Sequence, residues 1–127
     1  MSMCGPLIAI PAMTIELLFP TLPPALDGIG DHTVRLAAAL APTASVCIRT
    51  GAGPVQLPSD VGGGVTVVDG YDFSSWRGLA HLTRDLAQAR PDWVLLQYNP
   101  FSYGHWGFNP MLPWALRSLR HRAPDTR

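Results

Sequence analysis

The chain has 127 residues, of which 47% are hydrophobic and only 14% are charged, and its formal net charge is zero. This length can form one domain with a buried core. The apolar composition argues against a disordered chain. The lack of net positive charge argues against a partner with a phosphate backbone, so no nucleic acid is expected.

From the pattern of the N-terminal region we expect no integral membrane segment and no secretion signal. Its apolar stretch is interrupted by Pro6 and Pro11 and carries Glu16, whereas a membrane span needs about 20 apolar residues. A basic start, as in a secretory signal, is also missing. We therefore expect residues 1–12 to be a loose N-terminal extension and residues 13–127 to form the domain.

The two cysteines point to a free-thiol protein. Cys4 lies in the extension and Cys47 in an apolar run, so they form neither a disulfide framework nor a set of metal ligands. We expect a buried thiol at Cys47, no metal, and a cytoplasmic location, where thiols stay reduced.

Four short apolar runs predict β-strands, and apolar residues at helical spacing predict helices between them. The predicted strands are Ile15 to Phe19, Ala44 to Arg49, Val65 to Val68 and Trp93 to Tyr98. The predicted helices are Thr33 to Ala41, Ser75 to Arg90, and a last one that begins near Asn109-Pro110 or at Pro113. We expect Asp31 to cap the first helix and Ser74 or Ser75 to cap the second. The start at Pro113 is sterically simpler.

The alternation of strand and helix predicts an α/β fold. Such units form a parallel sheet with right-handed crossovers. We expect a Rossmann-like doubly wound sheet of about four strands with flanking helices, in the order 3-2-1-4. In that order the first and fourth strands are neighbours, and the loops that follow them meet at the carboxyl edge of the sheet.

The first of these loops ends in the segment Asp27-Gly28-Ile29-Gly30-Asp31-His32. Glycines allow a backbone to approach a ligand closely, and a helix start offers N–H groups to a phosphate. Gly28, Ile29, Gly30, Asp31 and His32 are therefore candidates for a phosphate or donor loop. A third glycine is absent, which disfavours NAD, and a loop that only turns into a helix remains an alternative.

The second loop, Gln97 to His105, combines aromatic rings with amides and hydroxyls. These groups suit a sugar, which needs a stacking surface and hydrogen bonds to its hydroxyls. The candidates for acceptor binding are Gln97, Tyr98, Asn99, Tyr103 and His105. The alternative is an aromatic loop that packs onto its own domain.

Hydrolytic and P-loop chemistry find no support in the sequence. Glu16 is the only glutamate, no G-x-S-x-G segment occurs, and a P-loop is excluded because the chain has no lysine. The catalytic residues stay unknown.

The strand Leu17-Leu18-Phe19-Pro20 followed by Gly28-Ile29-Gly30-Asp31-His32-Thr33 resembles the start of family-4-type glycosyltransferases of the GT-B fold. The segment Pro91-Asp92-Trp93-Val94-Leu95-Leu96-Gln97-Tyr98 is similar to the fourth strand and loop of the same N-terminal domain. The likeness covers nearly all of the chain after Met13. It implies transfer of a sugar from a nucleotide-diphosphate donor to an acceptor hydroxyl, with the acceptor held by this domain and no other cofactor.

The chain departs from that family in one respect that affects its function. A single glutamate cannot supply the E-x7-E motif of the C-terminal, donor-binding domain. We therefore expect a partial GT-B N-terminal domain, inactive alone, that meets nucleotide sugar and acceptor only in a complete enzyme. A non-catalytic binding or regulatory module derived from that fold is the alternative. An unpaired fourth strand also predicts self-association through its edge.

Overall fold

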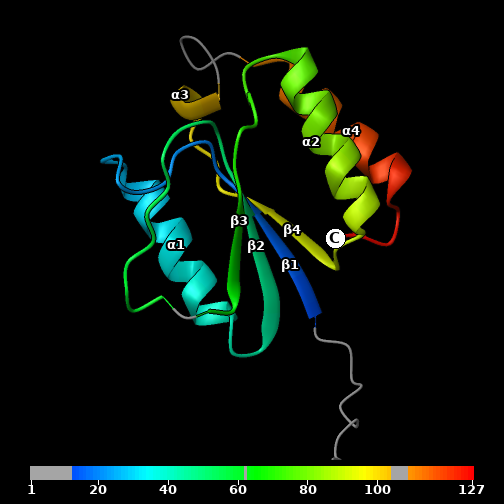
Figure 1. Ribbon diagram of the computed structural model, residues 1–127. Helices are drawn as coiled ribbons and strands as arrows, with labels where there is room; N and C mark the ends of the chain where they lie inside the picture. Colours follow the sequence, from blue (N-terminus) through cyan, green and yellow to red (C-terminus); the bar gives the residue numbers. More distant parts are fainter. Residues whose placement is uncertain (1–12, 62, 104–108) are drawn as a thin grey trace, which may run out of the picture.

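A four-stranded, all-parallel sheet forms the centre of the structure, a computed structural model that describes residues 13–61, 63–103 and 109–127. The strands are β1 (Met13–Leu18), β2 (Ala44–Arg49), β3 (Val65–Val68) and β4 (Trp93–Leu96). Their order is β3-β2-β1-β4 (Figure 1). This confirms the predicted α/β class and the predicted strand order, with β1 and β4 side by side.

Helices cover both faces of the sheet. They are α1 (Gly28–Leu40), α2 (Trp76–Ala89), the short α3 (Pro100–Tyr103) and α4 (Met111–Arg122). Figure 1 shows α1 on one face and the pair α2 and α4 on the other, with α3 near the carboxyl ends of the strands. The sheet is therefore the middle of three layers, as in doubly wound folds.

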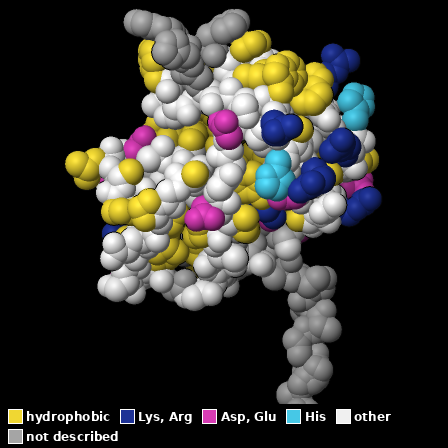
Figure 2. Space-filling view, turned by 45° about the horizontal axis from the view of Figure 1, so that its top comes forward, with side chains coloured by type: hydrophobic (Ala, Val, Ile, Leu, Met, Phe, Trp, Pro, Cys, Tyr) yellow, Lys and Arg dark blue, Asp and Glu magenta, His cyan; other side chains and the backbone are white. Residues whose placement is uncertain are grey.

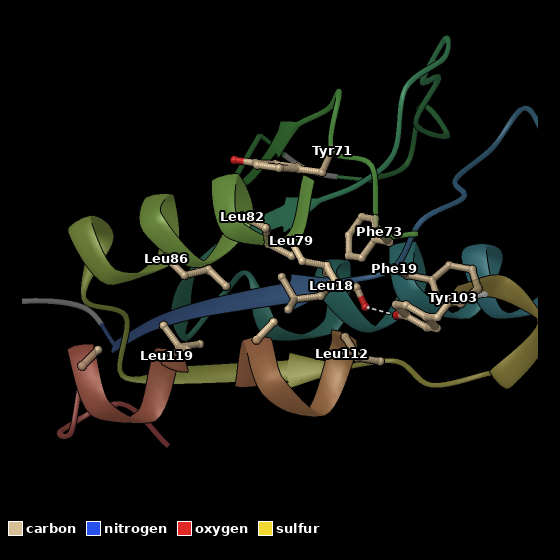
Figure 3. Close-up of a cluster of buried hydrophobic side chains, with 12 residues drawn as sticks. Leu18, Phe19, Tyr71, Phe73, Leu79, Leu82, Leu86, Tyr103, Leu112 and Leu119 are labelled. Atoms are coloured by element: carbon tan, nitrogen blue, oxygen red, sulfur yellow. Dashed lines mark hydrogen bonds between the residues drawn. The ribbon is translucent and has the colours of Figure 1, made fainter. Parts of the chain in front are cut away.

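Alternation along β1 divides the core in two. Ile15 and Leu17 pack with residues of α1, including Val34. Leu18 packs with Leu79 and other residues of α2, α4 and the aromatic loops (Figure 3). Because neighbouring residues of a strand face opposite sides, one six-residue strand joins both apolar layers.

The start of α1 differs from the prediction. The helix begins at Gly28, with Asp27 as its N-cap, whereas the sequence pattern predicted a start near Thr33 with Asp31 as the cap. The side chain of Asp27 accepts hydrogen bonds from the backbone N–H groups of Ile29 and Gly30. These bonds stabilise a helical first turn despite its two glycines, which disfavour helix by about 1 kcal/mol each. Asp31 lies within the first turn instead.

The start of α4 follows the first of the two predicted alternatives. The Oδ1 atom of Asn109 accepts from the N–H groups of Met111 and Leu112, while its amide nitrogen donates to the carbonyls of Phe73 and Tyr103. One side chain thus caps α4 and ties its start to two other loops. Pro113, the alternative start, lies within the first turn, where a missing N–H is tolerated.

Within the described residues, none of the helices combines the length and the apolar character needed to cross a membrane. Cys47 is a half-buried free thiol on β2. Burial, with the nearby Glu16 carboxylate, raises its pKa to about 11, so this thiol is protonated and unreactive at neutral pH.

Candidate functional site at the carboxyl edge

The two predicted loops meet at the carboxyl edge of the sheet. The backbone N–H of Gln97 donates to the carbonyl of Leu18 at 3.0 Å, which places the exits of β4 and β1 side by side. Ile29, at the start of α1, packs against the same apolar cluster as Tyr103 of the second loop. Figure 2, tilted to bring this edge forward, shows mostly hydrophobic and uncharged atoms on its described part, with arginines gathered on the side of α2 and α4.

The start of α1 offers fewer free N–H groups than the sequence suggested. The Asp27 carboxylate lies 2.9 Å from the nitrogen of Ile29 and 3.1 Å from that of Gly30. It therefore occupies the position where a phosphate would receive those bonds, and its negative charge repels an anion. The structure favours the capping role for this segment.

The two glycines of the loop have different roles. A Cβ at Gly30 would collide with the backbone carbonyl oxygen of Thr21, so this glycine is required by packing. A Cβ at Gly28 would meet no atom within 4 Å. Packing therefore gives no reason for glycine at position 28, and this position is the one where a ligand could approach the backbone. Asp31 and His32 follow on the exposed side of the helix.

Tyr103 is a core residue at the centre of the second loop. Only 1% of it is exposed, and its hydroxyl lies 3.1 Å from the carbonyl oxygen of Leu18 and close to that of Gln97 (Figure 3). Burial raises the pKa of this hydroxyl, which stays protonated as a donor. Tyr103 thus anchors the loop to β1 and does not present a surface to a ligand.

The neighbouring polar residues remain accessible to a ligand. Tyr98 is 58% exposed and stacks on Tyr103, with ring centroids 5.7 Å apart and an interplanar angle of 15°. Asn99 accepts a hydrogen bond from the N–H of Phe101, which starts α3. Gln97 is half-buried beside them. Of the predicted acceptor residues, His105 lies outside the described residues.

A hollow of about 360 Å³ lies at the same edge, between the loops that follow β1 and β2. Its lining includes Leu22, Pro24, Thr50, Gly51 and Val55, and no lining side chain is charged. The hydroxyl of Thr50 is buried and has no hydrogen-bond partner among the described residues. Sequence reasoning treated the segment after β2 only as a loop; its glycines and prolines signalled the turn but not the hollow.

A buried polar network beneath α2 was also missed. Glu16 on β1 pairs with the Nε of Arg49 on β2, and both side chains are about nine-tenths buried. Arg49 donates to the hydroxyl of Tyr71 at 2.7 Å, and that hydroxyl donates to Asp85 of α2 at 2.7 Å. The network runs from the sheet to the helix layer. Its hydrogen bonds and the opposite charges of Glu16 and Arg49 offset the free energy that burial of these two charges costs.

The network makes stability depend on pH. Partial burial opposes ionisation of Asp85, yet the hydrogen bond from Tyr71 and the nearby His81 lower its pKa below the usual value. A lowered folded-state pKa contributes stability above the unfolded pKa of about 3.9, and that stability is lost as pH falls through the folded value. We expect the stability difference between wild type and Asp85→Asn, measured by urea unfolding, to shrink as pH falls from about 5 to 2.5. A difference that stays constant over this range would contradict the assignment.

Comparisons with protein-family models, with curated proteins and with solved structures gave no match to this chain. Among the described residues, no group of three or more His, Cys, Asp or Glu side chains is placed to hold a metal ion. The site is therefore interpreted from its own geometry, which offers an exposed aromatic ring, amide groups and a neutral hollow at one edge.

Proposed function

We propose that the carboxyl edge binds a sugar, and that the chain is the acceptor-side part of a nucleotide-sugar-dependent glycosyltransferase. The observation that carries this proposal is the position of Tyr98. It is exposed at the carboxyl ends of β1 and β4, the point where the order of strand addition reverses. Stacking on the buried Tyr103 holds it in place. Open α/β sheets bind ligands at this switch point.

The surrounding groups suit a neutral, hydroxyl-rich ligand. The amides of Gln97 and Asn99 can donate to and accept from hydroxyls, and the ring of Tyr98 offers a surface for the apolar face of a sugar. Gly28 leaves open space at the start of α1. An E-x7-E motif needs two glutamates and residues 1–127 contain one, so in this proposal these residues hold the acceptor and the donor is bound by another part of the enzyme.

Binding to the labelled protein tests this proposal. In NMR titrations with glucose, mannose and UDP-glucose, we expect at least one ligand to shift the amide signals of Gln97 and Asn99. Replacing the ring in Tyr98→Ala should weaken that binding about five- to tenfold through loss of stacking. Trp76→Ala, which removes a similarly exposed ring on α2, should leave the affinity unchanged. Shifts confined to other surfaces, or equal losses in both variants, would refute the sugar site.

A non-catalytic binding module is the second candidate, and the Asp27 cap favours it. The cap uses two N–H groups that a donor phosphate would need. Asp27→Asn keeps a capping side chain but removes its charge. If phosphates bind at α1, this variant should bind UDP-glucose more tightly than wild type. If glucose and UDP-glucose bind equally well to both proteins, the binding module is the better description.

A further inference from the structure

Positive charge is concentrated on two neighbouring helices, although the chain as a whole has no formal net charge. Helices α2 and α4 contain five arginines and one aspartate, whereas the remainder of the chain contains four arginines and eight acidic residues. The two helices lie side by side on one face of the sheet (Figure 1), and Figure 2 shows arginine and histidine side chains gathered on their side of the molecule. The resulting basic face consists of five exposed arginines, which are Arg77, Arg84, Arg117, Arg120 and Arg122.

Most of these arginines have no acidic partner in the described part of the chain. Arg84 and His81 share the carboxylate of Asp85, the one acidic residue of the two helices. The other four arginines of the basic face form no ion pair with any described residue. Asp72, in the loop before α2, accepts two hydrogen bonds from Ser74. The positive charges are therefore available to an anionic group from outside the chain.

Two hollows lie among these arginines. One, with a volume of about 730 Å³, is lined in part by Arg77, Arg84 and Arg122. The other, with a volume of about 500 Å³, is lined by residues of α4 that include Arg117 and Arg122. Because Arg122 lines both hollows, they lie next to each other. The basic face is therefore recessed between its charges, so that side chains of a partner can enter it.

Trp114 adds an exposed aromatic ring to the basic face. It lines the second hollow and is 46% exposed. Its ring packs edge to face against Trp76 of α2, with centroids 4.8 Å apart and an interplanar angle of 73°, which fixes its position. Tryptophan and arginine are among the residue types that contribute most to the affinity of protein interfaces. Their combination here is typical of a surface that contacts another protein.

We propose that the basic face, with Trp114, docks an acidic segment of a different protein. Carboxylates of that segment pair with the arginines of both hollows, and an apolar side chain between them packs on the indole of Trp114. Arg77 and Arg84 lie two helical turns apart, which corresponds to about 10 Å along α2. This spread suits a row of separate carboxylates better than a single phosphate group. The inference does not depend on the sugar site.

A second copy of the chain fits the basic face less well. Glu16 and Asp60 form ion pairs with arginines of their own chain. The carboxylates of Asp27, Asp72 and Asp92 accept backbone hydrogen bonds. Five of the eight acidic residues outside α2 and α4 are thus engaged within the chain. A lipid surface is flat, whereas the basic face is hollowed, so the side chains of a polypeptide also fill it better than lipid headgroups do.

A labelled acidic peptide tests the proposal by fluorescence anisotropy at 0.15 M salt, where the Debye length is about 8 Å and distant charges are screened. The probe has four repeats of Glu-Glu-Leu, and the control peptide has four repeats of Gln-Gln-Leu. We expect saturable binding of the acidic peptide alone. Arg122→Gln should weaken it about fivefold, and Trp114→Ala about tenfold. Arg35→Gln removes the same charge from α1, on the opposite face of the sheet, and should leave the affinity unchanged.

Each possible result either supports the docking site or overturns it. Binding of the acidic peptide that weakens in Arg122→Gln and Trp114→Ala, but not in Arg35→Gln, supports it. Equal binding of the two peptides, no binding, or an equal loss in Arg35→Gln overturns it. Binding of polyphosphate or of phosphatidylglycerol vesicles, but not of the acidic peptide, overturns it and assigns the face to phosphate groups. Dimers of the chain alone that Arg122→Gln dissociates in size-exclusion chromatography overturn it in favour of a second copy.

Discussion

Gly78→Ala is expected to destabilise the protein by about 3 kcal/mol, although glycine-to-alanine changes usually stabilise a helix by about 1 kcal/mol. Gly78 lies in the first turn of α2. A Cβ there would approach three atoms of Asp72, including its backbone carbonyl oxygen, to less than 3.0 Å. Overpacking against backbone cannot be relieved by a side-chain rotation, so the chain must shift.

The loop around Asp72 has little freedom to give way. Its carboxylate accepts hydrogen bonds from the N–H and the hydroxyl of Ser74, at 3.0 and 2.6 Å. The next residue, Ser75, caps α2 through a 3.0 Å bond from the N–H of Gly78. A shift of α2 away from Asp72 would therefore break its own cap.

Thermal and urea unfolding measure this effect, with Gly28→Ala as the control. In a domain of this size, about 3 kcal/mol lowers the melting temperature by roughly 10 °C. Gly28 also lies in the first turn of a helix but has no atom within 4 Å of the added Cβ, so its variant should melt at or slightly above the wild-type temperature. If the two variants behave alike, close packing is not the reason for glycine at position 78.

The strand order could be predicted from the sequence because strand–helix alternation and crossover handedness together exclude most other orders. Four apolar runs separated by helical patterns, with right-handed crossovers, leave few arrangements of a parallel sheet. The ends of the helices were harder to predict. Asp27 and Asp31 are both good capping residues four positions apart, and two glycines follow the first of them. Only the bonds to Ile29 and Gly30 show that Asp27 is the cap.

The candidate site was predicted in part. The meeting of the two loops followed from the strand order, but the separation of Tyr98 from Tyr103 did not. Both are tyrosines in one polar loop, yet Tyr103 is buried because its hydroxyl reaches backbone carbonyls across the exit of β1. The four-residue α3, in which Tyr103 lies, has no apolar periodicity of its own. Burial of this kind depends on contacts between segments far apart in the sequence.

The Glu16–Arg49 pair illustrates the same limit, since its partners lie 33 positions apart. The sequence shows one glutamate within an apolar strand and one arginine at the end of another. In the β1–β2 register Glu16 lies opposite Cys47, so Arg49 sits one diagonal step away on the same face. A shift of one residue in that register would separate the two charges.

Arg49→Met is expected to cost about 3–5 kcal/mol, because it leaves the Glu16 carboxylate buried without its partner. The double variant Glu16→Met/Arg49→Met should recover most of this loss, since two apolar side chains of similar size replace a pair whose desolvation is expensive. Urea unfolding of the two single variants and the double variant gives the coupling energy between the sites, which we expect to exceed about 2 kcal/mol.

The exposed ion pair of Arg35 and Asp60 provides the matched control. Its nitrogen–oxygen distance is 2.7 Å, close to that of the buried pair, but its two side chains are 60% and 67% exposed. Solvent screens such a pair, so Arg35→Met should leave the unfolding midpoint unchanged. If the losses in the free energy of unfolding caused by the changes at positions 16 and 49 instead add without coupling, the two side chains act independently in the folded protein. The cost of each change would then come from lost packing, and the network would not be what joins β1 and β2 to α2.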